Sequence, residues 1–346
     1  MKIIVLCILF FSLCISANAN DGIVNSYGGN LFIAKESKIK MQKEYLEFTE
    51  VDEGMIVKVS FVFFNPGKAR KDTVGFVTPS YYEPGMDEKD EHPNISNFSA
   101  IVNGFPTNFK IAKLVEEEAI LRDITNENYG NFVYYFVVDF KPGANTVEHT
   151  YFFKPSGSSH GLSGYVYYNY VLKTAKNWAG EKIDTFECRI NYSKPFSIDK
   201  NLEKTMGVVW KIEGEGVMSQ TDYSDEVDTS KLFVNLGKGS LVYRKNNFVP
   251  ETDISIVDYY PIDNHPLLKS ILFDSNRVKS YTAKELRYAR NALFAIQGYV
   301  FKSKELQEHF SNYFWYTPNP SVESKPEYLP SVYREILEMI QEEEKK

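Results

Sequence analysis

The side chains that most often transfer protons or bind metals are few and scattered in this sequence. Its five histidines stand at positions 92, 149, 160, 265 and 309. Zinc sites usually set two histidines at i and i+4 on one helix face or combine histidines with closely spaced cysteines. Neither pattern occurs here. The sequence therefore predicts no metal site, and we expect no cofactor.

Two polar segments have the composition of functional loops but lack the required spacing. Residues 156–161 contain three serines and a histidine but no Gly-x-Ser-x-Gly elbow for a nucleophile. Residues 86–92 are acidic but lack the glycine-pivoted pattern of a calcium loop. Paired carboxylates of a glycosidase leave no signature in a single sequence. We therefore predict no catalytic residue and keep one alternative, an envelope hydrolase whose active site lies in the β-rich part of the chain.

Residues 1–19 have the pattern of a secretory signal. Met1-Lys2 supplies a positive start, residues 3–13 are almost entirely apolar, and Ala17-Asn18-Ala19 is a small-residue cleavage pattern. The apolar run is shorter than the roughly 20 residues that a spanning helix needs. We therefore expect an exported protein, periplasmic or extracellular, with cleavage near Ala19 and no transmembrane segment.

The cysteine content and the net charge bear on disulfide formation and on nucleic-acid binding. Cleavage would remove Cys7 and Cys14, so no intrachain disulfide can form. The remaining Cys188 lies in an alternating strand pattern, which favours a buried, unreactive thiol. The formal net charge is −7, and no basic stripe is present. Because nucleic-acid binding needs clustered cations, we expect no nucleic-acid partner.

Residues 20–262 have the pattern of short strands separated by turns that is typical of antiparallel β-structure. Residues 55–64 alternate in hydrophobicity and stop at Asn65-Pro66-Gly67, and Asn103-Gly104 is a strong hairpin signal. Residues 131–140 end at Lys141-Pro142-Gly143, and we expect residues 146–153 to return as their partner strand. We predict a β-sandwich-like body, which a second small sheet would divide near residue 205.

Residues 263–346 change to a helical period. Thr282 and Glu285 have the spacing of a capping box, and Gly298 predicts a left-handed helix stop. Ser303 is expected to cap a second helix, and a last helix is expected to begin at Ser331. The predicted fold class is therefore α+β multi-domain, with an antiparallel β-sandwich-like body followed by a small α-helical C-terminal module.

The helical segment contains Arg290-Asn291, Phe294-Ala295, Gly298-Tyr299, Phe301 and Trp315-Tyr316. In these residues it resembles the YARHG domain family over about residues 273–316, or to the C-terminus, whereas Ile296-Gln297 replaces the signature Arg-His pair of that family. The resemblance implies an extracellular module without an assigned activity. The body resembles an uncharacterised exported bacterial domain of unknown function through short motifs such as Gly28-Gly29-Asn30-Leu31.

These patterns suggest a binding or structural role for the helical module. We predict a non-catalytic exported protein of the cell envelope whose module docks a cell-wall glycan, peptidoglycan or an envelope protein. For each candidate residue the alternative is structural, either a hydrogen bond between helices or a place in an aromatic core. The candidate binding residues are Arg290, Asn291, Gln297, Tyr299, Trp315 and Tyr316.

Overall fold

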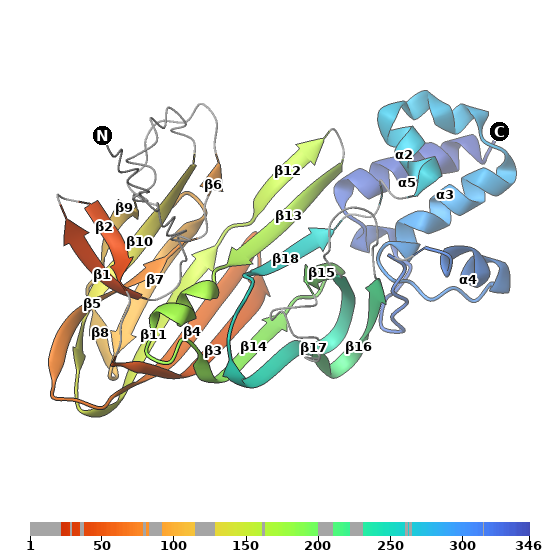
Figure 1. The fold of residues 1–346 in the computed structure, drawn as a ribbon. Helices are drawn as coiled ribbons and strands as arrows, with labels where there is room; N and C mark the ends of the chain where they lie inside the picture. The colour runs from red at the N-terminus through yellow and green to blue at the C-terminus, as the bar shows by residue number, and fades with distance from the viewer. Residues whose placement is uncertain are drawn as a thin grey trace, which may run out of the picture.

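The computed structural model describes residues 22–27, 30–34, 38–78, 81–82, 92–114, 129–160, 163–199, 210–221, 231–259, 262, 265–313 and 315–346. The predicted signal, its cleavage site and the acidic loop at 86–91 lie outside these residues. The described chain forms a β-rich body followed by a helical region, which confirms the predicted fold class (Figure 1). None of the helices it describes is long and apolar enough to cross a membrane.

The first sheet of the body closes on itself. Its strands follow the order β5 (Arg70–Val77), β1 (Gly22–Tyr27), β2 (Asn30–Ala34), β9 (Lys110–Leu114), β10 (Tyr129–Phe140) and β6 (Tyr81–Tyr82). Because β5 also pairs with β10, all of these strands except β6 form a ring. The β2–β9 contact, Leu31 opposite Leu114, is parallel, and the other pairs are antiparallel.

The second sheet extends from the first sheet toward the helical region (Figure 1). Its strands follow the order β12 (Ser156–His160), β13 (Ser163–Tyr170), β18 (Ile254–Tyr259), β15 (Phe196–Asp199), β17 (Lys231–Phe248), β14 (Ile183–Asn191), β3 (Lys40–Val51), β4 (Gly54–Asn65), β11 (Gly143–Phe153), β7 (Ile95–Val102) and β8 (Phe105–Thr107). The strand β16 (Lys211–Thr221) pairs with β17 outside this path, and the short 3-10 helix η1 (Lys173–Asn177) follows β13. β14 runs parallel to β3.

Two corners carry the chain between the sheets. β4 continues as β5, and β10 continues as β11 in the other sheet. The expectation that residues 146–153 pair with residues 131–140 is therefore wrong, because β11 pairs with β4 and β7 while β10 pairs with β5. Asn65 joins the corners, since its Nδ2 donates to Phe140 O at 3.2 Å. The Asn103-Gly104 hairpin is confirmed, with both residues at positive φ.

An aromatic core fills the space between the two layers. The ring centroid of Phe76 lies 5.0 Å from that of Tyr151 and 5.8 Å from that of Phe98. Cys188 is fully buried in this core, as predicted, and burial raises the pKa of its thiol. The helical region has a separate apolar core. The division into a signal at 1–19, a body at 20–262 and a helical module at 263–346 stays a prediction.

Strand β17 is the element that shapes the end of the body nearest the helices. Its first part pairs with β15, ending with Val234 opposite Phe196, and its last part pairs with β14, beginning with Leu241 opposite Ile190. The chain between β14 and β15 crosses the gap that this leaves. On its other edge β17 bulges at Gly237, which is skipped in the register with β16. The sheet is therefore interrupted beside residues 235–240.

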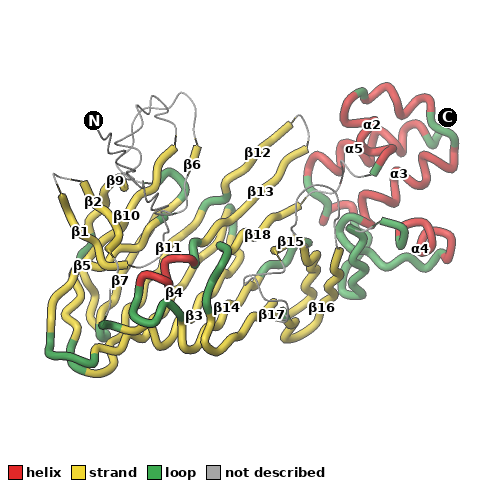
Figure 2. The backbone as a smooth tube through the Cα atoms, in the orientation of Figure 1, coloured by secondary structure: helices red, strands yellow, loops and turns green. Residues whose placement is uncertain are grey.

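The helical region packs around one central helix. Its elements are α2 (Pro266–Phe273), η3 (Ser275–Ser280), α3 (Ala283–Ala295), α4 (Lys304–Phe310), η4 (Pro326–Tyr328) and α5 (Ser331–Glu343). α3 packs against α2, α4 and α5, and Figure 2 shows these helices gathered at one end of the molecule.

The helix ends follow the predicted signals with one exception. Thr282 Oγ1 accepts from Glu285 N, and Glu285 Oε2 accepts from Thr282 N, so the capping box is confirmed. Gly298 has φ +86°, the predicted left-handed stop. Ser303 precedes α4 but makes no capping bond; its hydroxyl instead accepts from Arg287 at 3.4 Å.

Candidate functional site

Arg290 and Asn291, the polar pair of the helical motif, bind other parts of the helical region. The Arg290 guanidinium lies 3.2 Å from Glu344 Oε2, just beyond the end of α5. Asn291 Nδ2 donates to Arg287 O one turn earlier, at 2.7 Å. The first contact joins α3 to the end of α5, and the second lies within α3 itself. Neither residue lines either of the pockets described below.

The three aromatic candidates are built into the helical core. Trp315 is 3% exposed, and its ring lies 5.0 Å from Tyr313 and 6.4 Å from Phe310 between centroids. Tyr316 is half-buried and donates its hydroxyl to Tyr299 O at 2.8 Å. The structure thus places the Trp315 ring in the interior, where it cannot serve as a surface platform.

Gln297 and Gly298 lie where the helical region meets the body. Asn235 of β17 donates from Nδ2 to Gln297 O at 3.1 Å and to Thr317 O at 3.2 Å. Asn319 in turn donates to Asn235 Oδ1 at 3.2 Å. A Cβ on Gly298 would lie 2.0 Å from Asn235 Nδ2, so glycine is required for this approach. Because Asn235 and Asn319 are buried, the hydrogen bonds of their side-chain amides fix the body and the helical region against each other.

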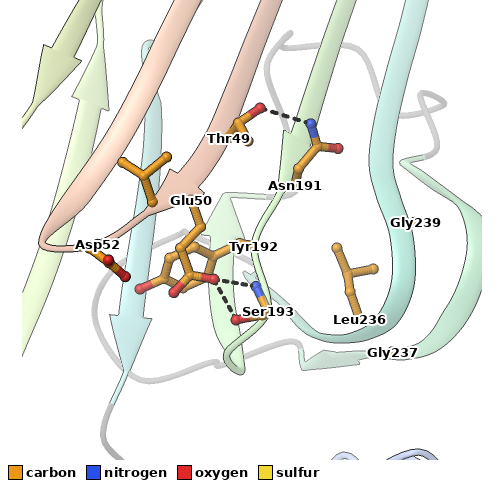
Figure 3. Close-up of a pocket in the computed structure, with 10 residues that line it drawn as sticks. Thr49, Glu50, Asp52, Asn191, Tyr192, Ser193, Leu236, Gly237 and Gly239 are labelled. Carbon is orange, nitrogen blue, oxygen red and sulfur yellow. Dashed lines mark hydrogen bonds between the residues drawn. The ribbon is translucent and has the colours of Figure 1, made fainter.

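A cavity of about 480 Å³ opens beside the interruption in the second sheet, and we call it the sheet pocket (Figure 3). Its walls come from the end of β3, the crossing between β14 and β15, and the bulged part of β17. Tyr192 and Leu236 are buried and provide its apolar surface. The ten lining residues are Thr49, Glu50, Val51, Asp52, Asn191, Tyr192, Ser193, Leu236, Gly237 and Gly239.

Glu50 organises the polar side of the sheet pocket. Its Oε2 accepts from Ser193 N at 2.7 Å and from Ser193 Oγ at 2.5 Å (Figure 3). Its Oε1 lies 3.4 Å from the Lys194 ammonium. Asp52, in the turn after β3, is exposed and makes no hydrogen bond or ion pair with the described residues. The pocket therefore presents one engaged carboxylate and one available carboxylate.

A buried acid lies behind the pocket wall. The Tyr192 hydroxyl donates to Asp258 Oδ2 at 2.6 Å, and the Lys194 ammonium lies 4.0 Å from the same oxygen. Burial raises the pKa of Asp258 above its usual range, and burial with the adjacent Asp258 raises the pKa of Tyr192. Lys194 therefore bridges the carboxyl groups of Glu50 and Asp258.

A second cavity, of about 370 Å³, lies between the body and the helical region, and we call it the junction pocket. Its body side includes Ser193, which also lines the sheet pocket, so the two cavities adjoin. Gln297 is the one sequence-predicted candidate that lines it. The lining residues are Ser193, Lys194, Pro195, Asn235, Phe294, Gln297, Ser321, Val322, Glu323, Lys325, Tyr328 and Leu329.

Sequence reasoning missed most residues of these two cavities. Glu50 and Asp52 belong to an ordinary acidic turn, and Ser193 and Lys194 to a short break between strands. The available signal was the cluster of breaks at 51–54, 192–195 and 237–239, because strand breaks gather where a sheet is interrupted. Their spatial proximity depends on strand order, which those segments do not encode locally.

Family models match both ends of the chain. Residues 266–345 match the YARHG domain. The C-terminal region is a YARHG domain. Residues 19–128 match a family described as a domain of unknown function, DUF4424. The YARHG match includes all of α2 to α5, so it extends well beyond the motif at residues 290–316. No curated protein matches the sequence.

Solved structures extend the similarity to most of the chain. A candidate nutrient-binding protein from Legionella pneumophila is 18% identical, with a TM-score of 0.52, and the match covers 90% of this chain and 95% of that one. This shows a shared fold over most of the chain. An M1 zinc metallopeptidase from Deinococcus radiodurans is 11% identical at a TM-score of 0.24, covering 65% of this chain and 43% of that one. That second similarity is too weak for a functional argument.

Proposed function

We propose that this chain is an exported, non-catalytic binding protein of the cell envelope that holds a small polar ligand in its two adjoining cavities. The observation that carries the proposal is the sheet pocket, because its volume of about 480 Å³ falls in the range of small-molecule sites. The pocket lies next to the junction between two regions that have separate cores. Ligand sites are common at such junctions. The YARHG domain, in this proposal, supplies one wall of the site.

Binding fits the cavities better than hydrolysis does. The Ser193 hydroxyl donates to Glu50, which resembles a nucleophile beside an acid. A serine nucleophile is most often activated by a histidine base. Among the described residues that line either cavity there is no histidine. Glu50 also accepts from the backbone N–H of Ser193, so it fixes the position of the pocket wall.

Two further observations support the location and the class of function. Residues 1–19 have the pattern of a secretory signal, and the YARHG resemblance implies an extracellular module. The Legionella protein that shares the fold carries a nutrient-binding name. A nutrient-binding role needs a ligand-sized cavity, which the sheet pocket provides.

The proposal is tested by calorimetric titration and thermal shift of the mature chain with a panel of amino acids, short peptides, sugars and amines. Val51→Trp would fill the sheet pocket, because Val51 lines it and is 38% exposed. The matched control is Val137→Trp on β10, which is 54% exposed and lines neither cavity. We expect at least one ligand to bind, and Val51→Trp but not Val137→Trp to abolish it. A panel without any binder contradicts the proposal.

Docking of a glycan, peptidoglycan or envelope protein through the helical module has weaker support. Trp315 is buried, and the Tyr316 hydroxyl is engaged by Tyr299 O. Retention of the protein on purified cell wall, lost in Arg290→Ala at unchanged stability, would favour this version over the cavity.

A further inference from the structure

The sheet pocket has the charge of a site for a cationic group. Two carboxylates line it, and the described residues of its lining include no lysine or arginine. The Glu50 side chain is 18% exposed, so a charge placed against it is partly shielded from water. Asp52 stands beside it without a partner among the described residues. A ligand ammonium in this pocket would meet both carboxylates.

The junction pocket has the opposite character. Lys194 and Lys325 line it together with one acid, Glu323. Lys325 is ion-paired with Glu323 and also donates to the Tyr328 hydroxyl at 3.3 Å. Lys194 is the other cation that lines the junction pocket. Its ion-pair partners, Glu50 and Asp258, do not line this pocket.

Lys194 connects the two cavities. Its side chain is 54% exposed and lines the junction pocket, yet its ammonium lies 3.4 Å from Glu50 in the sheet pocket. A ligand ammonium at Glu50 would replace Lys194 there. The released Lys194 ammonium, on a flexible four-carbon chain, would then be available to an anionic group in the junction pocket.

We propose that the two cavities together hold a short peptide with free ends, its N-terminal ammonium at Glu50 and Asp52 and its C-terminal carboxylate at Lys194. This proposal rests on the binding function proposed above and specifies its ligand. Cavities of about 480 and 370 Å³ exceed the needs of a single amino acid and suit an extended chain of a few residues. The apolar surfaces of Leu236 and Phe294 would contact the side chains between the two charged ends.

The test uses three probes that differ only at their ends: trialanine, N-acetyl-trialanine and trialanine amide. Charge-assisted contacts are worth more than neutral ones, so loss of either charge should weaken binding about tenfold or more. Calorimetric titration of the mature chain with each probe measures this. A neutral trisaccharide serves as the fourth probe.

Two variants assign the ends of the peptide. Asp52→Asn should reduce the difference between trialanine and its N-acetyl form, and Lys194→Gln should reduce the difference between trialanine and its amide. Asp184→Asn, a carboxylate that is 44% exposed and lies outside both cavities, is the matched control and should change neither difference.

The outcomes separate this proposal from the broader function. Equal affinity for all three alanine probes, or binding of the trisaccharide alone with sensitivity to Val51→Trp, overturns the peptide proposal and leaves the binding function standing. Absence of binding by these probes and by the wider solute panel overturns both. Charge-dependent trialanine binding that is unaffected by Asp52→Asn and Lys194→Gln also overturns the assignment of these cavities.

Discussion

The YARHG domain and the two cavities differ in how their residues are held. Several motif residues of the YARHG domain contact residues close to them in the sequence, as Tyr316 does with Tyr299. The cavity residues come from segments far apart, as Glu50 and Ser193 do. The Trp315 ring of the motif is packed in a core, whereas Asp52 and Lys194 are exposed. A recognisable motif can therefore mark the packing of a domain, while the exposed charged side chains of the proposed site lie in other segments of the chain.

The largest expected effect tests the structural role of the motif. Trp315→Ala removes a ring that is 3% exposed, so it should lower the free energy of unfolding by about 4 kcal/mol. Tyr328→Ala removes a ring that is 62% exposed in the junction pocket and should lower it by about 0.5 kcal/mol. Urea unfolding followed by circular dichroism measures both. Similar losses in the two variants would mean that the core and cavity aromatics do not differ in the way described.

Gly298→Ala should give the second largest loss in the free energy of unfolding, because backbone strain and a steric clash combine at this position. The positive φ penalises any Cβ, and the Cβ would lie 2.0 Å from Asn235 Nδ2 and 2.6 Å from Thr317 O. Together these predict a loss of about 3 kcal/mol. Gly180→Ala is the matched control, because Gly180 has φ +88° but open space around its Cβ position, and it should lose about 1 kcal/mol. Equal losses would remove the argument that the junction is tightly packed at Gly298.

The elements were predictable where a local signal fixes them. The Thr282–Glu285 box and the Gly298 stop follow from hydrogen bonding and backbone sterics within a few residues. The β-rich body and its separation from the helices follow from the change in hydrophobic period. The buried Cys188 follows from strand alternation.

The corners and the cavities were not predictable because they depend on which strands become neighbours. Lys141-Pro142-Gly143 has the composition of a hairpin turn, yet it passes the chain to the other sheet. The sheet pocket exists because β14 and β15 pair with different parts of β17, so the gap between them is a property of the register. Neither Glu50 nor Ser193 differs in its local sequence from an ordinary surface residue.

Acid should destabilise the YARHG domain through His265. This residue is 1% exposed, and burial together with nearby His309 lowers its pKa from 6.5 to about 4. Folding favours the neutral form of His265. The folded state is therefore at full stability above pH 6.5 with respect to this group, and it loses stability as the pH falls from 6.5 toward 4. The linkage predicts a loss of about 2 kcal/mol by pH 5.

The matched variant for this pH dependence is His265→Phe, which keeps an aromatic ring among Phe310, Tyr313 and Trp315. Its stability should change less between pH 7 and pH 5 than that of the unmodified chain. His149 in the body, whose pKa burial lowers to about 3, loses a similar amount of stability between pH 7 and pH 5, because this loss begins near the unfolded pKa of 6.5. His149 is present in both chains, so the difference between them reports on His265. An unchanged pH slope in His265→Phe would assign the acid sensitivity to other groups.

The smallest expected effect on stability belongs to the cavity carboxylates. Asp52→Asn should change the free energy of unfolding by less than about 0.5 kcal/mol, because Asp52 is exposed and has no partner among the described residues. Glu50→Gln should lower it by about 1 kcal/mol, since Glu50 accepts from Ser193 N and Oγ. Urea unfolding of the two variants at pH 7 measures the difference. A large loss in Asp52→Asn would show that this carboxylate is held by the fold, and the contrast between a packed motif and an available site would no longer apply to it.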